Sequence, residues 1–223
     1  MKATLLFGGT FDPVHAGHVA MATAALAETG ATHLTLLPAG NPYQRGRAPF
    51  ASAADRQAML GVAFEGMTKV SIDRRELSRE GNTYTADTLR EIRAEQTGET
   101  ALIWLIGSDA FSRLDTWHQW ESLFTLAHFA VVQRQDGAAA LTIASAPLLT
   151  ALSGRRVDVG TLANSASGQF AELTTRVPPV SSTAIRGRLQ QRQSIRGFAP
   201  DAVCDYIEHH KLYEQKEKPY VGY

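Results

Sequence analysis

The chain has 223 residues, of which 44% are hydrophobic and 20% are charged, and this balance is typical of a globular protein with one sizeable core. Lysine and arginine (22) equal aspartate and glutamate (22), and this neutral balance argues against a nucleic acid as partner. One cysteine, Cys204, excludes an internal disulfide. Without a signal-peptide pattern or a membrane-spanning run, we expect a cytoplasmic protein with no membrane partner.

Strand-like and helix-like segments alternate along the whole chain. The predicted strands are 4–7, 33–37, 70–73, 101–106, 129–132 and 173–177, and the predicted helices are 17–28, 52–66, 85–96, 117–126, 147–152, 182–191 and 200–209. We expect Gly30 to end the first helix, Thr85 to cap the start of the third and Gly98 to close it. This alternation predicts an α/β fold, with a doubly wound parallel sheet and helices on both faces. We expect one domain over residues 1–223, with a small helical portion at about 181–215.

Polar and glycine-rich segments follow several predicted strands directly. Gly8-Gly9, residues 38–41, residues 107–109 and Arg134 stand at these positions. Ligands of such sheets bind outside the carboxyl ends of the strands, so these segments should line one crevice. Residues 135–167 have no assigned role, and the last residues, 216–223, are expected to form a tail.

The stretch at residues 8–18 follows an apolar run and precedes an amphipathic one, so it forms a tight turn between a strand and a helix. Such a turn presents backbone N–H groups and a helix N-terminus to one point, as a phosphate site requires. His15 and His18 would share one face of the first helical turn. The glycines could also form a plain turn, but a zinc site lacks further ligands, and the dinucleotide fingerprint fails at Thr10.

No side chain stands out as a nucleophile, since the cysteine lies in a helical pattern and no serine lies in a G-x-S-x-G elbow. The crevice instead offers hydrogen-bond donors. A site built of donors suits phosphoryl or nucleotidyl transfer, where positioning and charge stabilisation supply most of the catalysis.

The run Gly8-Gly9-Thr10-Phe11-Asp12-Pro13-Val14-His15-Ala16-Gly17-His18 resembles the signature of the nucleotidyltransferase superfamily. Val180-Ser181-Ser182-Thr183-Ala184-Ile185-Arg186 resembles its second motif, in the expected order. Within the superfamily the chain is most similar to the bacterial nicotinate-nucleotide adenylyltransferase family, over nearly its whole length. The resemblance implies a Rossmann-like sheet of nucleotidyltransferase type and an enzyme of NAD biosynthesis.

The same resemblance implies adenylyl transfer from ATP, with Mg²⁺, to nicotinate mononucleotide, giving nicotinate adenine dinucleotide and pyrophosphate. It assigns catalysis to His15, His18 and Arg186. It assigns ATP binding to Gly8, Gly9, Thr10, Phe11, Gly107, Asp109, Ser182 and Thr183. It gives no dedicated protein ligand for the metal, which is expected to be held by phosphates and water.

For the mononucleotide, the resemblance points to Asn41, Thr85, Trp117, His118 and Arg134. Trp117 would stack on the pyridine ring, and Thr85 would receive the nicotinate carboxylate. By periodicity alone, Trp117 reads better as a core aromatic.

One loop departs from the pattern of the family. Relatives often carry a basic residue after Pro-Pro-His in the loop that here reads Asn41-Pro42-Tyr43-Gln44-Arg45, so which of residues 43–47 contacts phosphate is open.

Other acceptors, nicotinamide mononucleotide or phosphopantetheine, are alternatives within the superfamily, and a nucleotide sensor without turnover is an alternative outside enzymes. Basic pairs such as Arg74 with Arg75 could bind small anions. Whether the chain forms a homo-oligomer is open.

Overall fold

A computed structural model describes residues 1–42, 48–96, 100–135 and 141–214. Six parallel strands form one sheet in the order β3-β2-β1-β4-β5-β6. The strands are β1 (Ala3–Gly9), β2 (His33–Pro38), β3 (Val70–Ile72), β4 (Ala101–Gly107), β5 (His128–Val132) and β6 (Phe170–Glu172). The chain winds outward from β1 to one edge, then from β4 to the other, so the sheet order reverses between β1 and β4. This reversal is where an open parallel sheet of this kind binds its ligands.

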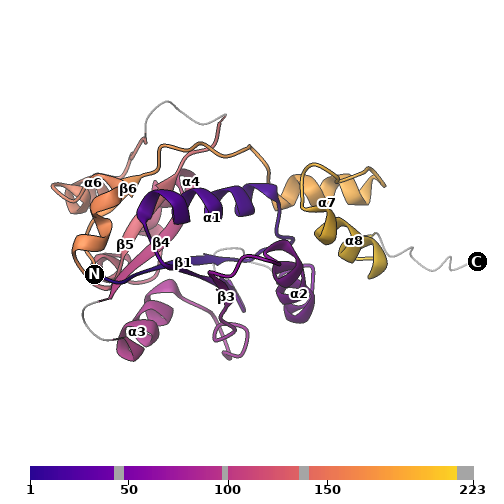
Figure 1. Cartoon of the computed structure of the whole chain (residues 1–223), viewed down its shortest axis with the longest axis horizontal. Helices are drawn as coiled ribbons and strands as arrows, with labels where there is room; N and C mark the ends of the chain where they lie inside the picture. Colours follow the sequence, from indigo (N-terminus) through magenta and orange to yellow (C-terminus); the bar gives the residue numbers. More distant parts are fainter. Residues whose placement is uncertain (43–47, 97–99, 136–140, 215–223) are drawn as a thin grey trace, which may run out of the picture.

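The helices cover both faces of the sheet (Figure 1). They are α1 (Ala16–Thr29), α2 (Ala53–Ala63), α3 (Thr85–Glu95), α4 (Ser108–Phe111), α5 (Trp120–Leu126), α6 (Ala146–Leu152), α7 (Ser182–Gln190) and α8 (Asp201–His209), with 3₁₀ turns η2 (Leu114–Thr116) and η3 (Val159–Asn164). The doubly wound α/β fold predicted from the sequence is confirmed.

Alternating side chains of the central strands point to two separate cores. In β4, Ile103 and Leu105 face the core that α1, α2, α7 and α8 complete, whereas Leu102, Trp104 and Ile106 face the core that α3, α5 and α6 complete. A strand buried on both faces needs apolar residues at every position, and this explains why β4 reads as an unbroken apolar run.

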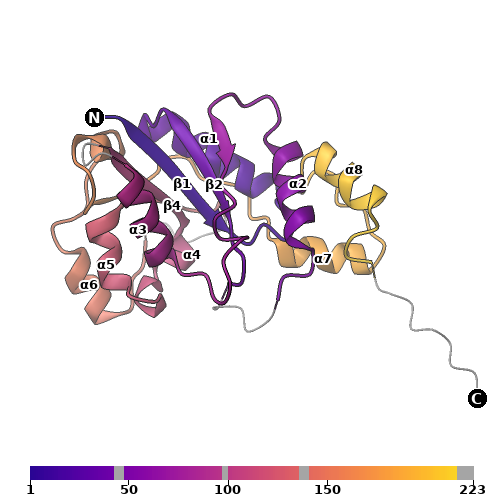
Figure 2. The ribbon, with the colours of Figure 1, turned by 90° about the horizontal axis from the view of Figure 1, so that it is seen from below.

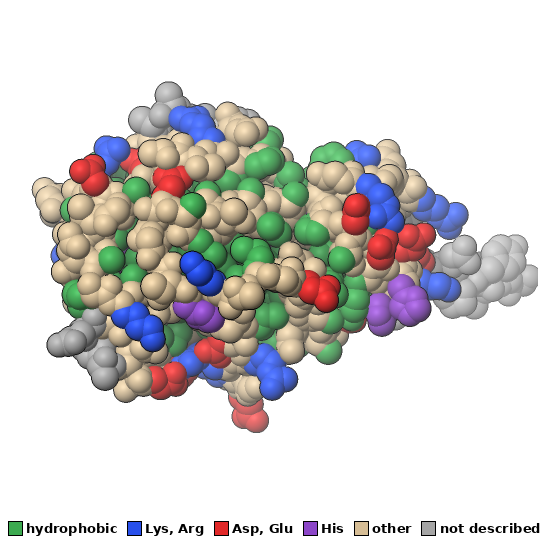
Figure 3. Space-filling model, in the orientation of Figure 1, with side chains coloured by type: hydrophobic (Ala, Val, Ile, Leu, Met, Phe, Trp, Pro, Cys, Tyr) green, Lys and Arg blue, Asp and Glu red, His purple; other side chains and the backbone are tan. Residues whose placement is uncertain are grey.

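The two C-terminal helices extend the molecule beyond the sheet. Figures 1 and 2 show α7 and α8 at the end where α2 lies, and α8 packs against α2. Ile185 of α7 and Val203 and Ile207 of α8 are buried in the core on the α1 face. On the face drawn in Figure 3, acidic and basic side chains are interspersed, as the neutral overall charge would give. None of the described helices has the length and apolarity needed to cross a membrane.

Most predicted elements are present with bounds shifted by one to three residues. Gly30 adopts a left-handed conformation (φ 67°) and ends α1, as predicted. Ser181, through its hydroxyl, caps α7 at the backbone N–H of Ala184.

Three predictions about the elements are wrong. The last strand is β6, Phe170–Glu172, not 173–177, because residues 170–172 are the ones that pair with β5. Thr85 is the first residue of α3 rather than its cap, and Tyr84 stands at the N-cap without a side-chain bond. Trp117 precedes α5, which starts at Trp120, because η2 occupies the preceding residues. The predicted roles of residues 43–47 and Gly98, and the tail 216–223, lie outside the described residues.

Candidate functional site

The turn between β1 and α1 brings the two histidines together through a reciprocal cap. His15 is the N-cap of α1, and its Nδ1 accepts a hydrogen bond from the backbone N–H of His18 (3.3 Å). The Nδ1 of His18 accepts one from the backbone N–H of His15 (3.2 Å). The two rings stack with centroids 3.6 Å apart. Since each Nδ1 is an acceptor, the neutral tautomer of each ring carries its proton on Nε2, which makes Nε2–H a donor.

His15 is buried, with 6% of its surface exposed. Burial, together with the positive charge of Arg134, lowers the pKa of His15 from 6.5 to about 4. The imidazole is therefore neutral at physiological pH, and it can act there as a hydrogen-bond donor rather than as a cation.

Asp12, a buried carboxylate in the same turn, joins three distant segments. Its oxygens accept hydrogen bonds from the backbone N–H groups of Phe50 (2.8 Å) and Ala51 (3.0 Å) and from the hydroxyl of Tyr213 (2.9 Å). Burial raises the pKa of Tyr213, and the negative carboxyl of Asp12 raises it further, so this hydroxyl stays protonated and donates. The turn is thus fixed by the residues before α2 and by the C-terminal end of the described chain.

The start of α7 lies directly against the turn. The Ser182 hydroxyl donates to the carbonyl of Pro13 (2.9 Å). Arg186 is 3% exposed, donates to the carbonyl of Asp12 and to the Thr183 hydroxyl (3.1 Å), and lies over the ring of Phe50. The structure therefore brings the two sequence motifs together, as one site would require, and it gives Arg186 a bracing role between them.

A cavity of about 270 Å³ opens beside the turn, at the carboxyl ends of β1 and β4. Its walls include four of the predicted ATP-binding residues and two of the predicted mononucleotide-binding residues. These are Gly8, Gly9, Thr10 and Gly107, with Thr85 and Trp117. Trp104 forms part of the wall and limits what can stand at position 8, since a Cβ there would lie 2.4 Å from the Trp104 ring. Gly8 is thus required by packing as well as by the turn.

Other predicted site residues lie outside the walls of this cavity. Asp109 and Arg134 form an ion pair with each other. The Asn41 amide donates to the Asn82 side chain (3.1 Å), and His118 lies against the Tyr84 ring, with centroids 4.2 Å apart. The buried Phe11 packs edge-to-face on His18 (5.0 Å). In this structure Asn41, Asp109 and His118 are exposed and Arg134 is half-buried.

Sequence reasoning missed several residues of this region. Arg56, buried, donates to the carbonyls of Thr10 (2.9 Å) and Ala39 (2.7 Å) and so ties the segments after β1 and β2 together. The helical pattern of α2 by itself assigns no role to Arg56. The available signal is that an arginine lies on the apolar side of the helix. Arg75, expected as an anion binder, is instead held by the carboxylates of Asp73 and Glu95.

The geometry combines neutral histidine donors, a glycine turn at a helix N-terminus and an aromatic-lined cavity at the sheet's reversal point. These features suit the binding of a nucleoside phosphate and a second, ring-bearing substrate. No group of three or more His, Cys, Asp or Glu side chains in the described ranges is arranged to hold a metal ion. A family model described as cytidylyltransferase-like matches residues 6–188, so the chain belongs to this family of nucleotidyltransferases.

Curated relatives narrow the class further. A protein of Cellvibrio japonicus named "Probable nicotinate-nucleotide adenylyltransferase" is 38% identical over 96% of this chain and 100% of its own length. A protein of the same name from Pseudomonas paraeruginosa is 42% identical over 93% of this chain and 95% of its own. The chain is a member of the nicotinate-nucleotide adenylyltransferases, as the sequence resemblance implied.

A solved structure supports the fold. Plasmodium falciparum nicotinic acid mononucleotide adenylyltransferase, complexed with NaAD, matches 96% of this chain and 98% of its own with a TM-score of 0.67. Its sequence is only 18% identical, so this likeness concerns the fold alone.

Proposed function

We propose that this enzyme transfers the adenylyl group of ATP to nicotinate mononucleotide, giving nicotinate adenine dinucleotide and pyrophosphate. The observation that carries the proposal is the adjacency of two half-sites. A turn with two histidine donors adjoins a cavity that contains Trp117 and Thr85, and both are formed at the ends of β1 and β4. Family membership supplies the identity of the two substrates.

In the reaction, a 5′-phosphate oxygen of the mononucleotide attacks the α-phosphorus of ATP in line. The bond from that phosphorus to the bridging oxygen breaks, and pyrophosphate leaves with the electron pair. The Nε2–H groups of His15 and His18 would donate to phosphate oxygens as negative charge builds on them. Because the reciprocal cap already fixes both rings, little reorganisation is needed when charge develops.

The start of α7 would hold the β- and γ-phosphates. Its N-terminus carries the positive end of a helix dipole. Thr183 would add its hydroxyl as a donor, and Ser182, whose hydroxyl donates to Pro13, would add its backbone N–H. Arg186 adds positive charge to this place and keeps α7 on the turn through the carbonyl of Asp12. Gly107 and Asp109 would contact the rest of ATP, with the carboxylate of Asp109 accepting from ribose hydroxyls.

The cavity would hold the mononucleotide. Trp117 would stack on the pyridine ring, and the start of α3 would receive the nicotinate carboxylate at Thr85. Tyr84, the N-cap residue of that helix, provides no side-chain cap, so an incoming carboxylate can fill this role. Asn41, His118 and Arg134 would provide further contacts for the acceptor.

Mg²⁺ would enter this site with ATP, bound to phosphate oxygens and water. The residues at the turn suit a metal ion that is bound by the phosphates rather than by the protein. They provide hydrogen-bond donors for phosphate instead of oxygen ligands for a cation. When bound, the ion would neutralise charge on the triphosphate.

Pyrophosphate release with ATP and Mg²⁺ tests the proposal, with nicotinate mononucleotide, nicotinamide mononucleotide and phosphopantetheine compared as acceptors. We expect a strong preference for nicotinate mononucleotide. A preference for another acceptor would overturn the assignment of the cavity and keep the phosphate chemistry. Binding of ATP without release from any acceptor would indicate a nucleotide sensor.

A further inference from the structure

The cavity beside the turn contains one ionisable side chain among its described walls, Glu76. The other described lining residues are glycines, threonines and apolar or aromatic side chains. They are Phe7, Gly8, Gly9, Thr10, Ala39, Pro42, Thr83, Thr85, Trp104, Leu105, Ile106, Gly107, Ala110 and Trp117. No described wall residue therefore carries a positive charge to balance this carboxyl group. A single acid among the described walls of the cavity is a specific feature that the reaction scheme above does not use.

The carboxyl group of Glu76 is fixed and buried. Glu76 is 6% exposed, and its Oε1 lies 2.7 Å from the hydroxyl of Thr88 on α3, which is fully buried. Thr88 also accepts a hydrogen bond from Arg79 Nη1 (3.1 Å). Since a guanidinium only donates, the single hydroxyl hydrogen of Thr88 must point to Glu76. Oε1 of Glu76 is thus an acceptor.

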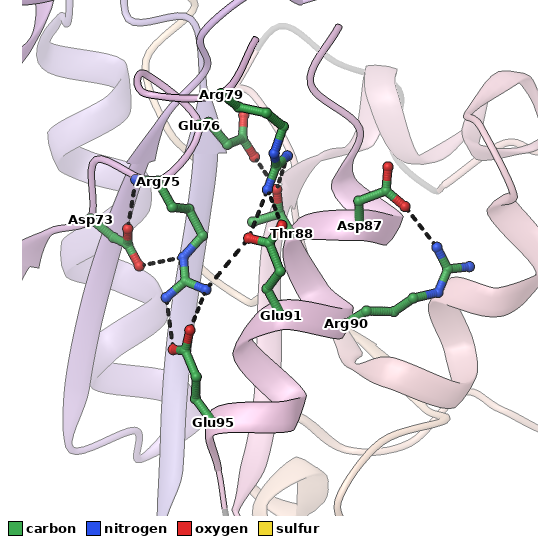
Figure 4. A network of polar contacts seen from close by, with 9 residues as sticks. All are labelled: Asp73, Arg75, Glu76, Arg79, Asp87, Thr88, Arg90, Glu91 and Glu95. Atoms are coloured by element: carbon green, nitrogen blue, oxygen red, sulfur yellow. Dashed lines mark hydrogen bonds and ion pairs between the residues drawn. The ribbon is translucent and has the colours of Figure 1, made fainter. Parts of the chain in front are cut away.

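The backbone at Glu76 is fixed as well. A Cβ at Gly40 would lie 2.0 Å from the Glu76 carbonyl oxygen, so the segments after β2 and β3 approach as closely as glycine permits. Figure 4 shows how the connection between β3 and α3 is braced from outside. There Arg79 pairs with Glu91 (2.7 Å) and Arg75 with Glu95 (2.9 Å).

Burial raises the pKa of Glu76, while the hydrogen bond from Thr88 and the charge of Arg79 act in the opposite direction. Arg79 is committed to Thr88 and to Glu91 on the outer side of this network, and it is not among the described cavity walls. A cation placed in the cavity would stabilise the ionised carboxylate, because it replaces the solvation lost on burial.

A flat cation is the ligand that complements these walls. Trp117 is an aromatic wall residue, and aromatic rings attract cations and stack on other rings; the carboxyl group of Glu76 belongs to the same cavity, and a bound cation would hold it in the ionised form. The ring of a pyridine mononucleotide is a pyridinium ion, because its nitrogen carries the ribose. The geometry points to Glu76 as a specificity-determining residue that selects the positive charge of the pyridinium ring. This inference rests on the proposed function and adds to it a reason why the ring must be cationic.

The test compares two acceptors that differ in ring charge alone. One is nicotinate mononucleotide, and the other is its C-riboside analogue, in which carbon replaces the ring nitrogen, so that an uncharged benzene ring carries the same carboxylate. Binding to the wild-type enzyme, to Glu76→Gln and to Glu91→Gln is measured by calorimetry at one pH and salt concentration. Glu91→Gln is the matched control, because it removes a carboxylate from the same network at a side chain that is not among the described walls of the cavity.

We expect the wild-type enzyme to bind the cationic ring on the order of tenfold or more tightly than the neutral one, as an opposite charge in a buried site allows. Glu76→Gln should bring the two affinities within about twofold of each other, whereas Glu91→Gln should keep the wild-type ratio. Equal weakening of both acceptors by Glu76→Gln would show a purely structural role and overturn the inference.

Two further outcomes keep the inference falsifiable. If Glu76→Gln does not fold, the wild-type ratio alone decides, and equal affinity for the two rings overturns the inference. Failure of the proposed function looks different, since the wild-type enzyme would then release no pyrophosphate with nicotinate mononucleotide.

Discussion

The phosphate turn and the acceptor cavity adjoin each other but are built in different ways. The turn is formed by residues 8–18 and by the start of α7, and hydrogen bonds within the protein hold its polar side chains in place. The cavity is a space of about 270 Å³ between segments that follow four strands, with mostly apolar walls. One region is a set of oriented donors, and the other is a cavity whose described walls include one ionisable residue, Glu76.

This difference predicts different consequences of mutation. Donors that are oriented in advance act on charge as it develops, so their loss should lower kcat. Walls that contact a bound ring act equally on the ground state and the transition state, so their loss should raise KM. The following experiments test this division, starting from the largest expected effect.

The neutral state of His15 should make folding stability depend on pH. Its pKa is about 4 in the folded protein against 6.5 as the ordinary value, so between pH 6.5 and 4 the unfolded chain binds a proton that the folded protein does not. The contribution of His15 to the free energy of unfolding is therefore largest above pH 6.5, and it decreases by up to about 3 kcal/mol as the pH falls to 4. His15→Asn keeps a cap acceptor without a titrating ring. Chemical denaturation from pH 7 to 4 should show the wild-type protein losing free energy of unfolding relative to the His15→Asn variant. A constant difference between the two free energies would contradict the assignment.

Removing the donor of His18 should lower kcat by on the order of 10²-fold. His18→Asn can place an oxygen where Nδ1 now accepts the backbone N–H of His15, so the cap survives while Nε2–H is lost. His18→Gln does the reverse, and it should retain more activity and lose more stability. Steady-state kinetics together with thermal unfolding separate the two effects. A folded His18→Asn protein with near-normal kcat would show that the ring donates nothing to the reaction.

On the cavity side, Trp117→Ala should raise KM for the mononucleotide by about tenfold and leave KM for ATP nearly unchanged. Trp120, also half-buried but not among the described walls of the cavity, is the matched control, and its alanine variant should affect stability more than either KM. An equal rise in both KM values for Trp117→Ala would mean that this residue supports the fold rather than the ring.

The same division explains what could be predicted from the sequence. The turn is one contiguous segment, so its glycines and histidines can be interpreted together. The parallel sheet with helices on both faces follows from the alternation of strands and helices. The second motif, taken together with this turn, is enough to assign Arg186 to the same site, and in the structure Arg186 donates to the carbonyl of Asp12 in the turn. Asp12 shows the limit of prediction from local sequence, because no neighbouring residue indicates that Tyr213 donates a hydrogen bond to its carboxylate.

The cavity shows the limit more strongly. Glu76 lies in a charged run, Arg74 to Glu80, which reads as a solvated surface, and only the tertiary approach of Gly40 and Thr88 buries it. The predicted start of α5 was wrong for a related reason. The 3₁₀ turn η2 is formed by the residues before Trp117, and Trp117 lines the cavity instead of starting the helix. In both cases contacts between distant segments decide the outcome.

The ion pair between Asp109 and Arg134 lies outside the described walls of the cavity, and its loss should have the smallest effect. The side chains are 62% and 40% exposed, so Asp109→Asn should cost less than about 1 kcal/mol of stability. If Asp109 accepts from the ribose of ATP and Arg134 contacts the mononucleotide, Asp109→Asn should raise KM for ATP about threefold, and Arg134→Met should raise KM for the acceptor by a similar factor. A double variant distinguishes two cases. Additive changes would mean that each residue serves its own substrate, whereas strongly non-additive changes would mean that the pair acts as one unit and couples the turn to the cavity.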